Sequence, residues 1–475
     1  MPTAEIQPAT IHLKRVLGRW DLVLLFVVAI VNLNVVPTIA ASGGVTVWLW
    51  LISILLFFWP QGIAVVELSH RYPGEGGVYL WTKKIFGDFH GFLSGWCYWT
   101  NNIFYVPTVV LIFLSIAVYA VGPRAAALAN NQAFALITSL MLFVLLVVLN
   151  ILGLGVGKWV NNVGGIGTAV ASVILIGLGV VMTHRFGLNL TAHDLAIPFD
   201  LGLLSSFGVI CFGLVGLELA SIMGDEIQDP KQTVPFAVAW GGVISGILYL
   251  GATFSLLVAI PRPEVSTLQG IPEAVGRMSL RVGAGWLISP FAFVLSISIA
   301  GIASAWLSGS ARIPFVAGLD RYLPSSLGKL HPRFATPYIA LVVQGVISIA
   351  FLGMSFIGAQ VKEAFETLLK LAVVLQLVPF LYMFAALIRL ASHGPKGNGY
   401  YSGPVLKLAG FSGFIVTSIG MLLAFYPSPG ITSRWAFEVK MWVGTLVLIA
   451  LAAFFFYVYG NRRHKAAPQV NLTGA

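Results

Sequence analysis

Charged residues are scarce in this chain of 475 residues: Asp, Glu, Lys and Arg make up 9% of it, whereas 58% of the residues are hydrophobic. An average soluble domain is about a quarter charged, so this composition cannot cover an ordinary water-soluble surface. Cysteine is also scarce, and because Cys97 and Cys211 both lie in apolar stretches, a disulfide framework is not a credible source of stability. The composition predicts a protein whose whole body lies in a membrane.

Several chemical signatures are missing as well. The sequence has no Walker loop, and its eight histidines are scattered without the spacing of metal ligands. The glycine-rich run 153–157 lies at a membrane-edge turn and not after a strand, and the net charge of +10 is not gathered in a basic helix or an RNA-binding motif. We therefore expect no cofactor, no metal, no nucleic-acid partner and no enzymatic activity.

Twelve apolar blocks account for most of the chain, and each is long enough to span a hydrocarbon core of about 30 Å. They cover residues 21–41, 46–69, 92–121, 131–152, 160–183, 203–222, 235–260, 284–309, 337–357, 365–391, 404–426 and 436–459. Most of the 27 Lys and Arg residues fall in the segments that are inside if the N-terminus is cytoplasmic. We predict an all-α, multi-pass protein of a bacterial-type plasma membrane, surrounded by lipid, with both termini cytoplasmic and no cleavable signal peptide.

Two of these blocks contain helix breakers at matching places. The first carries Asn32, Asn34 and Pro37, and the sixth carries two glycines followed by Glu218. Non-helical backbone at membrane depth is tolerated where it lines protein or a wet cavity, and broken helices in two halves of a chain indicate a transporter site. Blocks one and six are five apart, as two inverted five-helix repeats require. The alternative is that Gly and Pro only kink or closely pack these helices.

Four segments, at residues 67–79, 216–235, 306–324 and 377–387, carry a family resemblance. They include an acidic, aromatic-Pro, Gly-Gly, Tyr pattern and the run DEIQDPKQTVP. The chain resembles the amino acid-polyamine-organocation (APC) superfamily of transporters, including bacterial arginine/agmatine and glutamate/GABA antiporters. This resemblance implies a LeuT-like 5+5 inverted repeat with broken helices 1 and 6. The implied organisation is a cytoplasmic segment 1–20, a transport core 21–391, two further helices in 392–459 and a cytoplasmic tail 460–475.

The resemblance also implies a substrate site at the two breaks. Exposed amides of the first break would hold the substrate carboxylate, and carbonyls of the sixth would hold its ammonium. Phe212 aligns with an aromatic gate and Trp306 with a tryptophan that stacks on substrate, although both residue types also pack ordinary cores. The Gly-Ser/Ala-Gly turn usual in the first span is absent here. The predicted substrate-binding residues are Ile30, Val31, Asn32, Asn34, Asn101, Asn102, Phe212, Gly213, Leu214, Val215 and Trp306.

Three ionisable residues are candidates for coupling. Glu218 is the only acid deep in a predicted span, where it is protonated, paired with exposed amides or a proton-coupling group. Stabilisation of the unwound sixth helix is the leading interpretation. Lys158 is either a counterpart of the lysine that replaces sodium in some relatives or, as we favour, a positive-inside anchor. Lys370 either selects substrates by charge or forms a helical ion pair with Glu366.

These observations predict a secondary active transporter of amino acids, working by alternating access through proton-coupled symport or substrate exchange. A polyamine or amine transporter is the alternative, which the sparse acids disfavour. A membrane sensor that does not transport is a remote third reading. The predicted partners are an amino acid or amine, protons and membrane lipid, and the sequence leaves open whether the protein is a homodimer.

Overall fold

The computed structural model describes residues 13–460, except 14, 41, 123, 124, 126, 127, 129, 130, 188–203, 205, 260–269, 321, 356–360, 394–398 and 428–432. Most of the predicted N-terminal segment 1–20 and nearly all of the predicted tail 460–475 lie outside the described residues.

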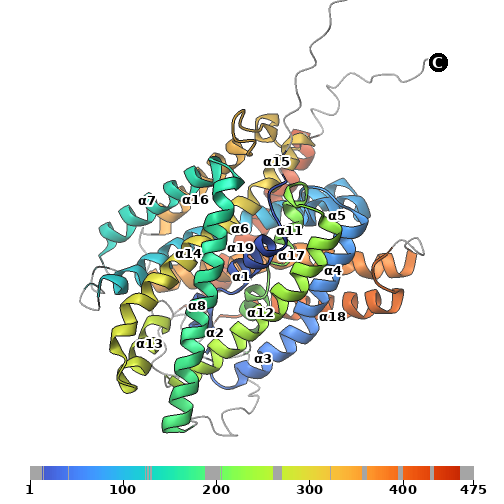
Figure 1. Cartoon of the computed structure of the whole chain (residues 1–475). Helices are drawn as coiled ribbons and strands as arrows, with labels where there is room; N and C mark the ends of the chain where they lie inside the picture. Colours follow the sequence, from blue (N-terminus) through green and yellow to red (C-terminus); the bar gives the residue numbers. More distant parts are fainter. Residues whose placement is uncertain are drawn as a thin grey trace, which may run out of the picture.

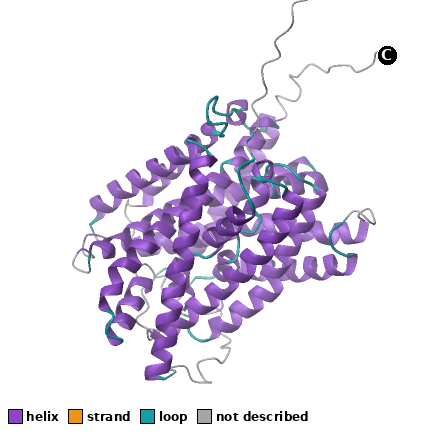
Figure 2. Cartoon of the chain, viewed as in Figure 1, coloured by secondary structure: helices purple, strands orange, loops and turns teal. Residues whose placement is uncertain are grey.

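Helices joined by short loops make up the described part of the chain, which contains no strand beyond isolated bridges (Figure 2). The helices are α1 (Arg19–Ile30), η1 (Leu33–Val35), α2 (Val36–Ala40), α3 (Val45–Ser53), η2 (Ile54–Phe58), α4 (Trp59–Arg71), α5 (Val78–Phe86), α6 (Asp88–Val121), α7 (Gln132–Ile151), α8 (Leu154–Phe186), α10 (Ser206–Gly213), α11 (Leu219–Ile222), η4 (Gly224–Glu226), α12 (Pro230–Ala259), α13 (Gly270–Arg281), η6 (Gly285–Leu287), α14 (Ile288–Ser310), α15 (Arg312–Leu319), η7 (Ser325–Gly328), α16 (Tyr338–Ser355), α17 (Val361–His393), α18 (Gly403–Ala424), α19 (Arg434–Phe454) and η8 (Phe455–Gly460). The all-α prediction is thereby confirmed.

Eight helices among the described residues are long and apolar enough to cross a membrane, and two shorter apolar helices join them. The first and sixth predicted spans do not form single long helices, because each is split into shorter pieces. In the apolar window of α6, 72% of the residues are buried, against 17% in the window that begins with α19. Helix α6 is therefore central, and α19 lies at the rim with its apolar side chains facing outward, as a lipid environment requires.

The split segments lie at the centre of the bundle. Helix α1 packs against α8, α12 and α14, while α6 packs against α14 and α17 (Figure 1). In addition, α1 contacts α11, and α2 contacts α10. Because the first half of one broken span meets the second half of the other, the two spans run side by side in opposite directions. Both interruptions are thus brought to the same depth.

A pair of glycines sets one close helix crossing beside this centre. A Cβ atom added to Gly164 of α8 would lie 2.7 Å from the Cα of Gly301 in α14. Small residues allow two helix backbones to approach each other closely in a membrane, where dispersion contacts replace the hydrophobic effect as the main attraction. This crossing holds α14, and with it Trp306, against α1.

Candidate substrate site

The first interruption lies between α1 and η1. Helix α1 ends at Ile30, and Val31 and Asn32 leave the helical conformation, with ψ angles of 78° and 91°. The side chain of Asn32 then caps the next turn, since its Oδ1 accepts hydrogen bonds from the Asn34 backbone N–H at 3.1 Å and from Asn34 Nδ2 at 2.7 Å. An Asn at this position satisfies an amide that a new helix leaves unpaired. The two asparagines therefore restart the helix after the break.

Side chains from other helices satisfy the end of α1. The Tyr249 hydroxyl donates to the Ile30 carbonyl at 2.5 Å and accepts from the Asn32 N–H at 2.9 Å. Trp306 Nε1 donates to the Ala29 carbonyl at 3.0 Å. The Asn32 Nδ2 also donates to the Tyr105 hydroxyl, at 2.5 Å. Neutral donors and acceptors thus hold the first break open and satisfy the Ala29 and Ile30 carbonyls and the Asn32 N–H.

The second interruption lies between α10, which ends at Gly213, and α11, which begins at Leu219. Gly216 has φ at +143°, and a Cβ atom there would come within 2.7 Å of Ile30 Cγ1. Only glycine adopts this conformation readily while also allowing that close approach to the first break. Gly216 is therefore the residue that brings the two interruptions together.

Glu218 stabilises the second break and is fully buried. Its Oε2 accepts from the Gly216 N–H and from Gln61 Nε2, both at 2.9 Å, and its Oε1 accepts from the Tyr98 hydroxyl at 2.9 Å. Gln376 Nε2 lies 3.5 Å from Oε1. A buried carboxylate needs such a set of donors, because an unpaired one is costly. The geometry fits the predicted stabilisation of the unwound sixth helix, and it places an ionisable group on the break itself.

The two interruptions close around one small cavity of about 10 Å³, which is about the space that one water molecule needs. Its wall consists of Ala29, Ile30, Asn32, Val35, Tyr105, Phe212, Gly213, Val215 and Trp306. The Tyr105 ring packs edge-on against Phe212 and against Trp306, with centroids 5.1 and 5.9 Å apart. No Asp, Glu, Lys or Arg side chain belongs to this wall. The site is shut in this conformation and is smaller than any amino acid.

Six of the predicted site residues meet at this wall: Ile30, Asn32, Phe212, Gly213, Val215 and Trp306. Val31, Asn34 and Leu214 belong to the interruptions but not to the wall. The structure places Asn101 and Asn102 elsewhere: Asn101 Nδ2 donates to Gln376 Oε1 at 2.6 Å, and Asn102 Nδ2 donates to the Tyr98 carbonyl at 2.9 Å. The Asn101 amide thus joins α6 to α17, the alternative that mid-helix amides always allow, whereas the Asn102 amide bonds within α6.

Two tyrosines at the site, Tyr105 and Tyr249, are not among the residues predicted from the sequence. Tyr105 follows Tyr98 by seven residues and Asn102 by three, so a helical reading of this stretch places all three on one face. That spacing was the available signal for Tyr105. Tyr249 carries a weaker one: a hydroxyl in the middle of an apolar helix usually has a buried hydrogen-bond partner. The identity of that partner, 217 positions away at Asn32, cannot be read from spacing.

The two lysine candidates lie away from the cavity wall. Lys158 Nζ donates to the Val16 carbonyl at 3.2 Å and lies 3.5 Å from Asp21 Oδ2, where α1 begins. Lys370 Nζ donates to the Tyr426 carbonyl at 2.6 Å and lies 5.6 Å from the centre of the Phe437 ring. The side chain of Glu366, its predicted partner, lies outside the described residues. Both lysines thus tie helices together in this conformation, whatever further role they have.

Charged side chains gather instead between the cavity and the side of the bundle on which Leu17 lies, here called the N-terminal side. Arg312 Nη2 pairs with Glu226 at 2.8 Å, and Arg312 Nε lies 3.5 Å from Glu75. Lys83 pairs with Asp320 at 2.6 Å. We call these five residues the charged layer. Burial, together with the neighbouring Glu226, raises the pKa of Glu75 well above its ordinary value. Among the described residues, no group of three or more His, Cys, Asp or Glu side chains is placed to hold a metal ion.

Backbone contacts join the charged layer to the segment that precedes α1. The N–H groups of Val16 and Leu17 donate to the Glu226 carbonyl at 2.9 and 3.0 Å, and the Gln228 N–H donates to the Leu17 carbonyl at 2.9 Å. Glu75 Oε2 accepts from the Asp225 N–H at 3.1 Å. The connection after α11 is therefore clamped between the N-terminal segment and the loop that follows α4.

An all-helical body, with long apolar helices and two interrupted spans at its centre, defines a multi-pass membrane protein. The sequence model of the amino acid permease family matches residues 17–451, and the chain belongs to that family, within the APC superfamily. The family resemblance predicted from the sequence is thereby confirmed. The family is that of amino acid permeases and the similar curated proteins are transporters, so the chain is a transporter of the amino acid and amine class.

Three relatives show the range of the family. An uncharacterized transporter of Legionella pneumophila is 27% identical over 94% of this chain and 97% of its own length. A probable agmatine/putrescine antiporter of Lactococcus lactis is 24% identical over 87% of this chain and 88% of its own length. A serine/threonine exchanger of Bacillus subtilis is 24% identical over 90% of this chain and 92% of its own length. Agmatine and putrescine differ in charge from serine and threonine, so family membership alone does not select a substrate.

Proposed function

We propose that this protein is a secondary active transporter that carries amino acids across the cytoplasmic membrane by alternating access, with both termini cytoplasmic. Its twelve spans would form a LeuT-like 5+5 inverted repeat with two helices beyond the core. The observation that carries the proposal is the meeting of two interrupted helices, at Val31–Asn32 and at 214–218, around one buried cavity. Interrupted helices expose backbone amides and carbonyls that bind a zwitterion without charged side chains.

The substrate carboxylate is assigned to the first break. There the Asn32 N–H is held by the Tyr249 hydroxyl, an oxygen that a carboxylate oxygen can replace. The ammonium is assigned to the carbonyls at the end of α10, around Phe212 to Val215, because the last carbonyls of a helix lack partners within that helix. The rest of the wall is aliphatic or aromatic. This arrangement favours an amino acid with an uncharged side chain.

An amine is the second candidate, and the Lactococcus relative supports it, since that protein is a probable agmatine/putrescine antiporter. A diamine brings two positive charges and no carboxylate. The cavity wall has no acid to receive the second charge, and Glu218 already accepts from the Gly216 N–H, Gln61 and Tyr98. We therefore rank the amine below the amino acid as a substrate, and the same assay tests both.

Transport requires this cavity to widen and to open toward each side in turn. The aromatic group of Phe212, Tyr105 and Trp306 covers the cavity, and we assign Phe212 as the gate. The charged layer closes the N-terminal side, so inward opening must separate Arg312 from its two carboxylate neighbours. Binding energy released when the substrate replaces internal hydrogen bonds would contribute to that rearrangement.

Glu218 is the proposed coupling group. As a carboxylate it accepts from the Gly216 N–H and from two side chains of neighbouring helices. A proton on either oxygen converts one acceptor into a donor and weakens this set of bonds. Proton binding and the geometry of the sixth break are therefore linked by direct contact. Lys158 and Lys370 are not needed for this step, because both are engaged at other helices.

Purified protein in liposomes tests the function. Neutral and acidic amino acids, agmatine and putrescine are offered as labelled substrates, with an internal counter-substrate or with a pH gradient. We expect a neutral amino acid to accumulate, and a requirement for the counter-substrate or for the gradient separates exchange from symport. Trp306→Ala should abolish uptake, whereas Trp435→Ala, at a tryptophan that is 76% exposed, should leave it unchanged. Uptake of amines alone would move the assignment to the second candidate, and no flux of any of these compounds would refute the proposal.

A further inference from the structure

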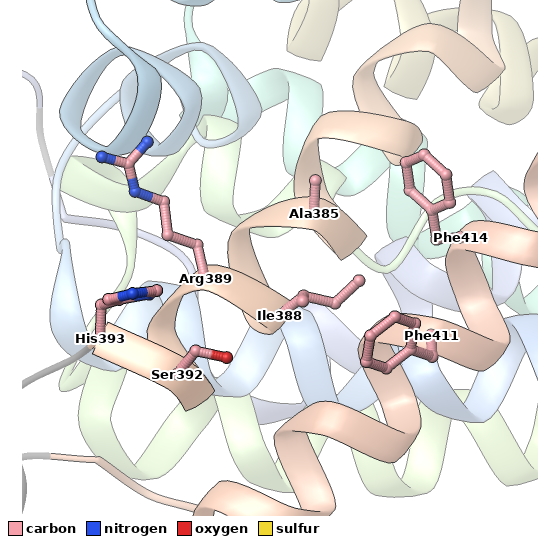
Figure 3. Close-up of a pocket in the computed structure, with 7 residues that line it drawn as sticks. All are labelled: Ala385, Ile388, Arg389, Ser392, His393, Phe411 and Phe414. Carbon is pink, nitrogen blue, oxygen red and sulfur yellow. The ribbon is translucent and has the colours of Figure 1, made fainter.

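An open groove of about 620 Å³ lies between the end of α17 and the first half of α18, far along the chain from the two breaks. Its lining divides into two parts (Figure 3). Arg389, Ser392 and His393 form one end, and the aromatic rings of Phe411 and Phe414 form the other. The groove therefore joins a basic, hydrogen-bonding end to an apolar end.

The helical spacing accounts for this division. Arg389, Ser392 and His393 occupy the last turns of α17 at intervals of three and one residues, so they point to one side of the helix. Phe411 and Phe414 are three residues apart on α18, and Lys407 lies one turn before Phe411. A further positive charge is thus carried by α18 toward the end of the groove where α17 ends.

The groove opens at the outer surface of the bundle and at its N-terminal edge. Phe411 and Phe414 are 52% and 37% exposed, on a helix whose apolar window is only 39% buried. Residues 400 and 401, just before α18, lie against the end of α4, because the Tyr400 N–H donates to Glu67 Oε2 at 2.8 Å. The basic end therefore lies at the membrane edge, and the aromatic end faces the depth at which acyl chains lie.

The basic end has no acidic counterpart in the part of the chain that the structure describes. No carboxylate among these residues pairs with Arg389 or His393, and the contact of Arg389 there is with a ring, since its guanidinium carbon lies 5.5 Å from the centre of Phe86. A cation over an aromatic ring keeps most of its hydrogen-bond donors free. Other arginines of the N-terminal side, such as Arg71 and Arg312, are paired with glutamates.

We propose that this groove binds an anionic phospholipid. The phosphate would accept hydrogen bonds from the Arg389 guanidinium, the Ser392 hydroxyl and the His393 ring, while an acyl chain lies along Phe411 and Phe414. Charge complementarity selects an anionic headgroup, because basic pockets between transmembrane helices at the cytoplasmic side bind such lipids. The aromatic end of the groove favours a lipid over a free phosphate, because a free phosphate has no apolar part to bury. The assignment does not depend on the transported substrate.

Native mass spectrometry of the full-length protein, titrated in detergent with phosphatidylglycerol or with phosphatidylcholine of the same chains, tests the site. We expect one phosphatidylglycerol to bind before all others, with phosphatidylcholine binding more weakly. Arg389→Gln should lower the first phosphatidylglycerol affinity about fivefold, the effect of one cation near an anionic headgroup. His393→Gln, at an exposed side chain whose replacement does not threaten folding, should lower it to a smaller extent.

A matched control removes an equally exposed cation outside the groove. Lys231→Gln, in the first turn of α12, should leave the first phosphatidylglycerol affinity unchanged. Equal losses for Lys231→Gln and Arg389→Gln would mean that total charge sets lipid binding, and the site would be refuted. Unchanged affinity in the Arg389→Gln/His393→Gln double variant would refute it as well. Free phosphate that competes with the lipid at equal concentration would overturn the choice of a lipid.

Discussion

The cavity and the charged layer solve the problem of polarity inside a membrane in opposite ways. The cavity wall has no Asp, Glu, Lys or Arg, and the polar contacts around it come from backbone groups, an asparagine, two tyrosines and a tryptophan. The charged layer lies toward the N-terminal side and brings Arg312, Glu226 and Glu75 together with exposures below one tenth. A neutral wall leaves the substrate as the only charge in the site, whereas a paired layer can hold a closed state together and release it.

Glu218 combines a property of each of these two regions. It is as buried as Arg312 and Glu226 of the charged layer, but its hydrogen-bond partners are neutral, as at the cavity. One of them is the backbone of the sixth break, so its protonation state bears directly on the backbone that we assign to the substrate. The comparison therefore predicts large energetic effects in the layer, large effects on transport at the breaks, and pH effects where a carboxylate is buried.

The largest loss of stability is expected from Arg312→Gln. This change leaves Glu226 buried without its cation, and breaking a buried ion pair on one side costs about 3–5 kcal/mol. Equilibrium unfolding in detergent micelles, followed by tryptophan fluorescence, measures the change. Lys83→Gln removes the cation of the more exposed pair in the same layer and should cost about 1 kcal/mol or less. Equal losses for the two variants would remove the distinction between buried and exposed pairs on which the charged layer rests.

Gly216→Ala is the next largest change and acts at the breaks. The added Cβ would lie 2.7 Å from Ile30 Cγ1, at a residue whose φ of +143° is unfavourable for alanine. Overpacking of this kind costs about 2–3 kcal/mol, and because it separates the two interruptions, substrate uptake should be lost. Gly177→Ala is the matched control, since nothing lies within 4 Å of a Cβ at that position. Normal uptake by Gly216→Ala would show that the close approach of the breaks is not required.

The places of both breaks could be predicted from the sequence, because the signals are local. Asn32 and Asn34 before a proline, and two glycines before a buried acid, are unusual within twenty apolar residues. The partners could not be predicted in this way. Tyr249 meets Asn32 across 217 positions, and Arg312 meets Glu226 across 86. Such pairs depend on helix packing, which spacing along one segment does not reveal.

The asparagines of α6 also show that the direction of a side chain cannot be predicted from its type and its depth in a helix. Their type and depth made Asn101 and Asn102 reasonable site residues, and their neighbour Tyr105 reaches the cavity. Residues three and four positions apart on a helix share a face, so spacing alone does not tell which of these side chains reaches the cavity. The direction of the face can be fixed only when the contacts of the helix are known, and here Gln376 of α17 takes the amide of Asn101.

A moderate effect on stability and a larger one on coupling are expected from Glu218→Gln. The amide keeps the shape of the carboxylate but offers one acceptor fewer to the Gly216 N–H, Gln61 and Tyr98. Loss of one buried hydrogen bond costs about 1–2 kcal/mol. If Glu218 couples protons to transport, uptake by the variant should no longer respond to a pH gradient, whereas counter-substrate exchange should survive. Gln61→Ala serves as the control, because it removes one donor but leaves the carboxyl group. A pH response that persists in Glu218→Gln would contradict the coupling role.

The smallest expected effect concerns Glu75 and the pH dependence of the charged layer. Burial and Glu226 raise the pKa of Glu75 above 4.5, more than Arg312 lowers it. A folded-state pKa above the unfolded value means that the stabilising contribution is complete below about pH 4.5 and is lost as the pH rises through the raised value. Glu75→Gln stays neutral and keeps an oxygen for the Asp225 N–H. The unfolding free energies of wild type and variant should therefore be similar near pH 5 and diverge toward pH 8, with the variant the more stable. A variant that is less stable at pH 8 would show that the attraction of Arg312 dominates, and Glu75 would then be an ionised member of the layer.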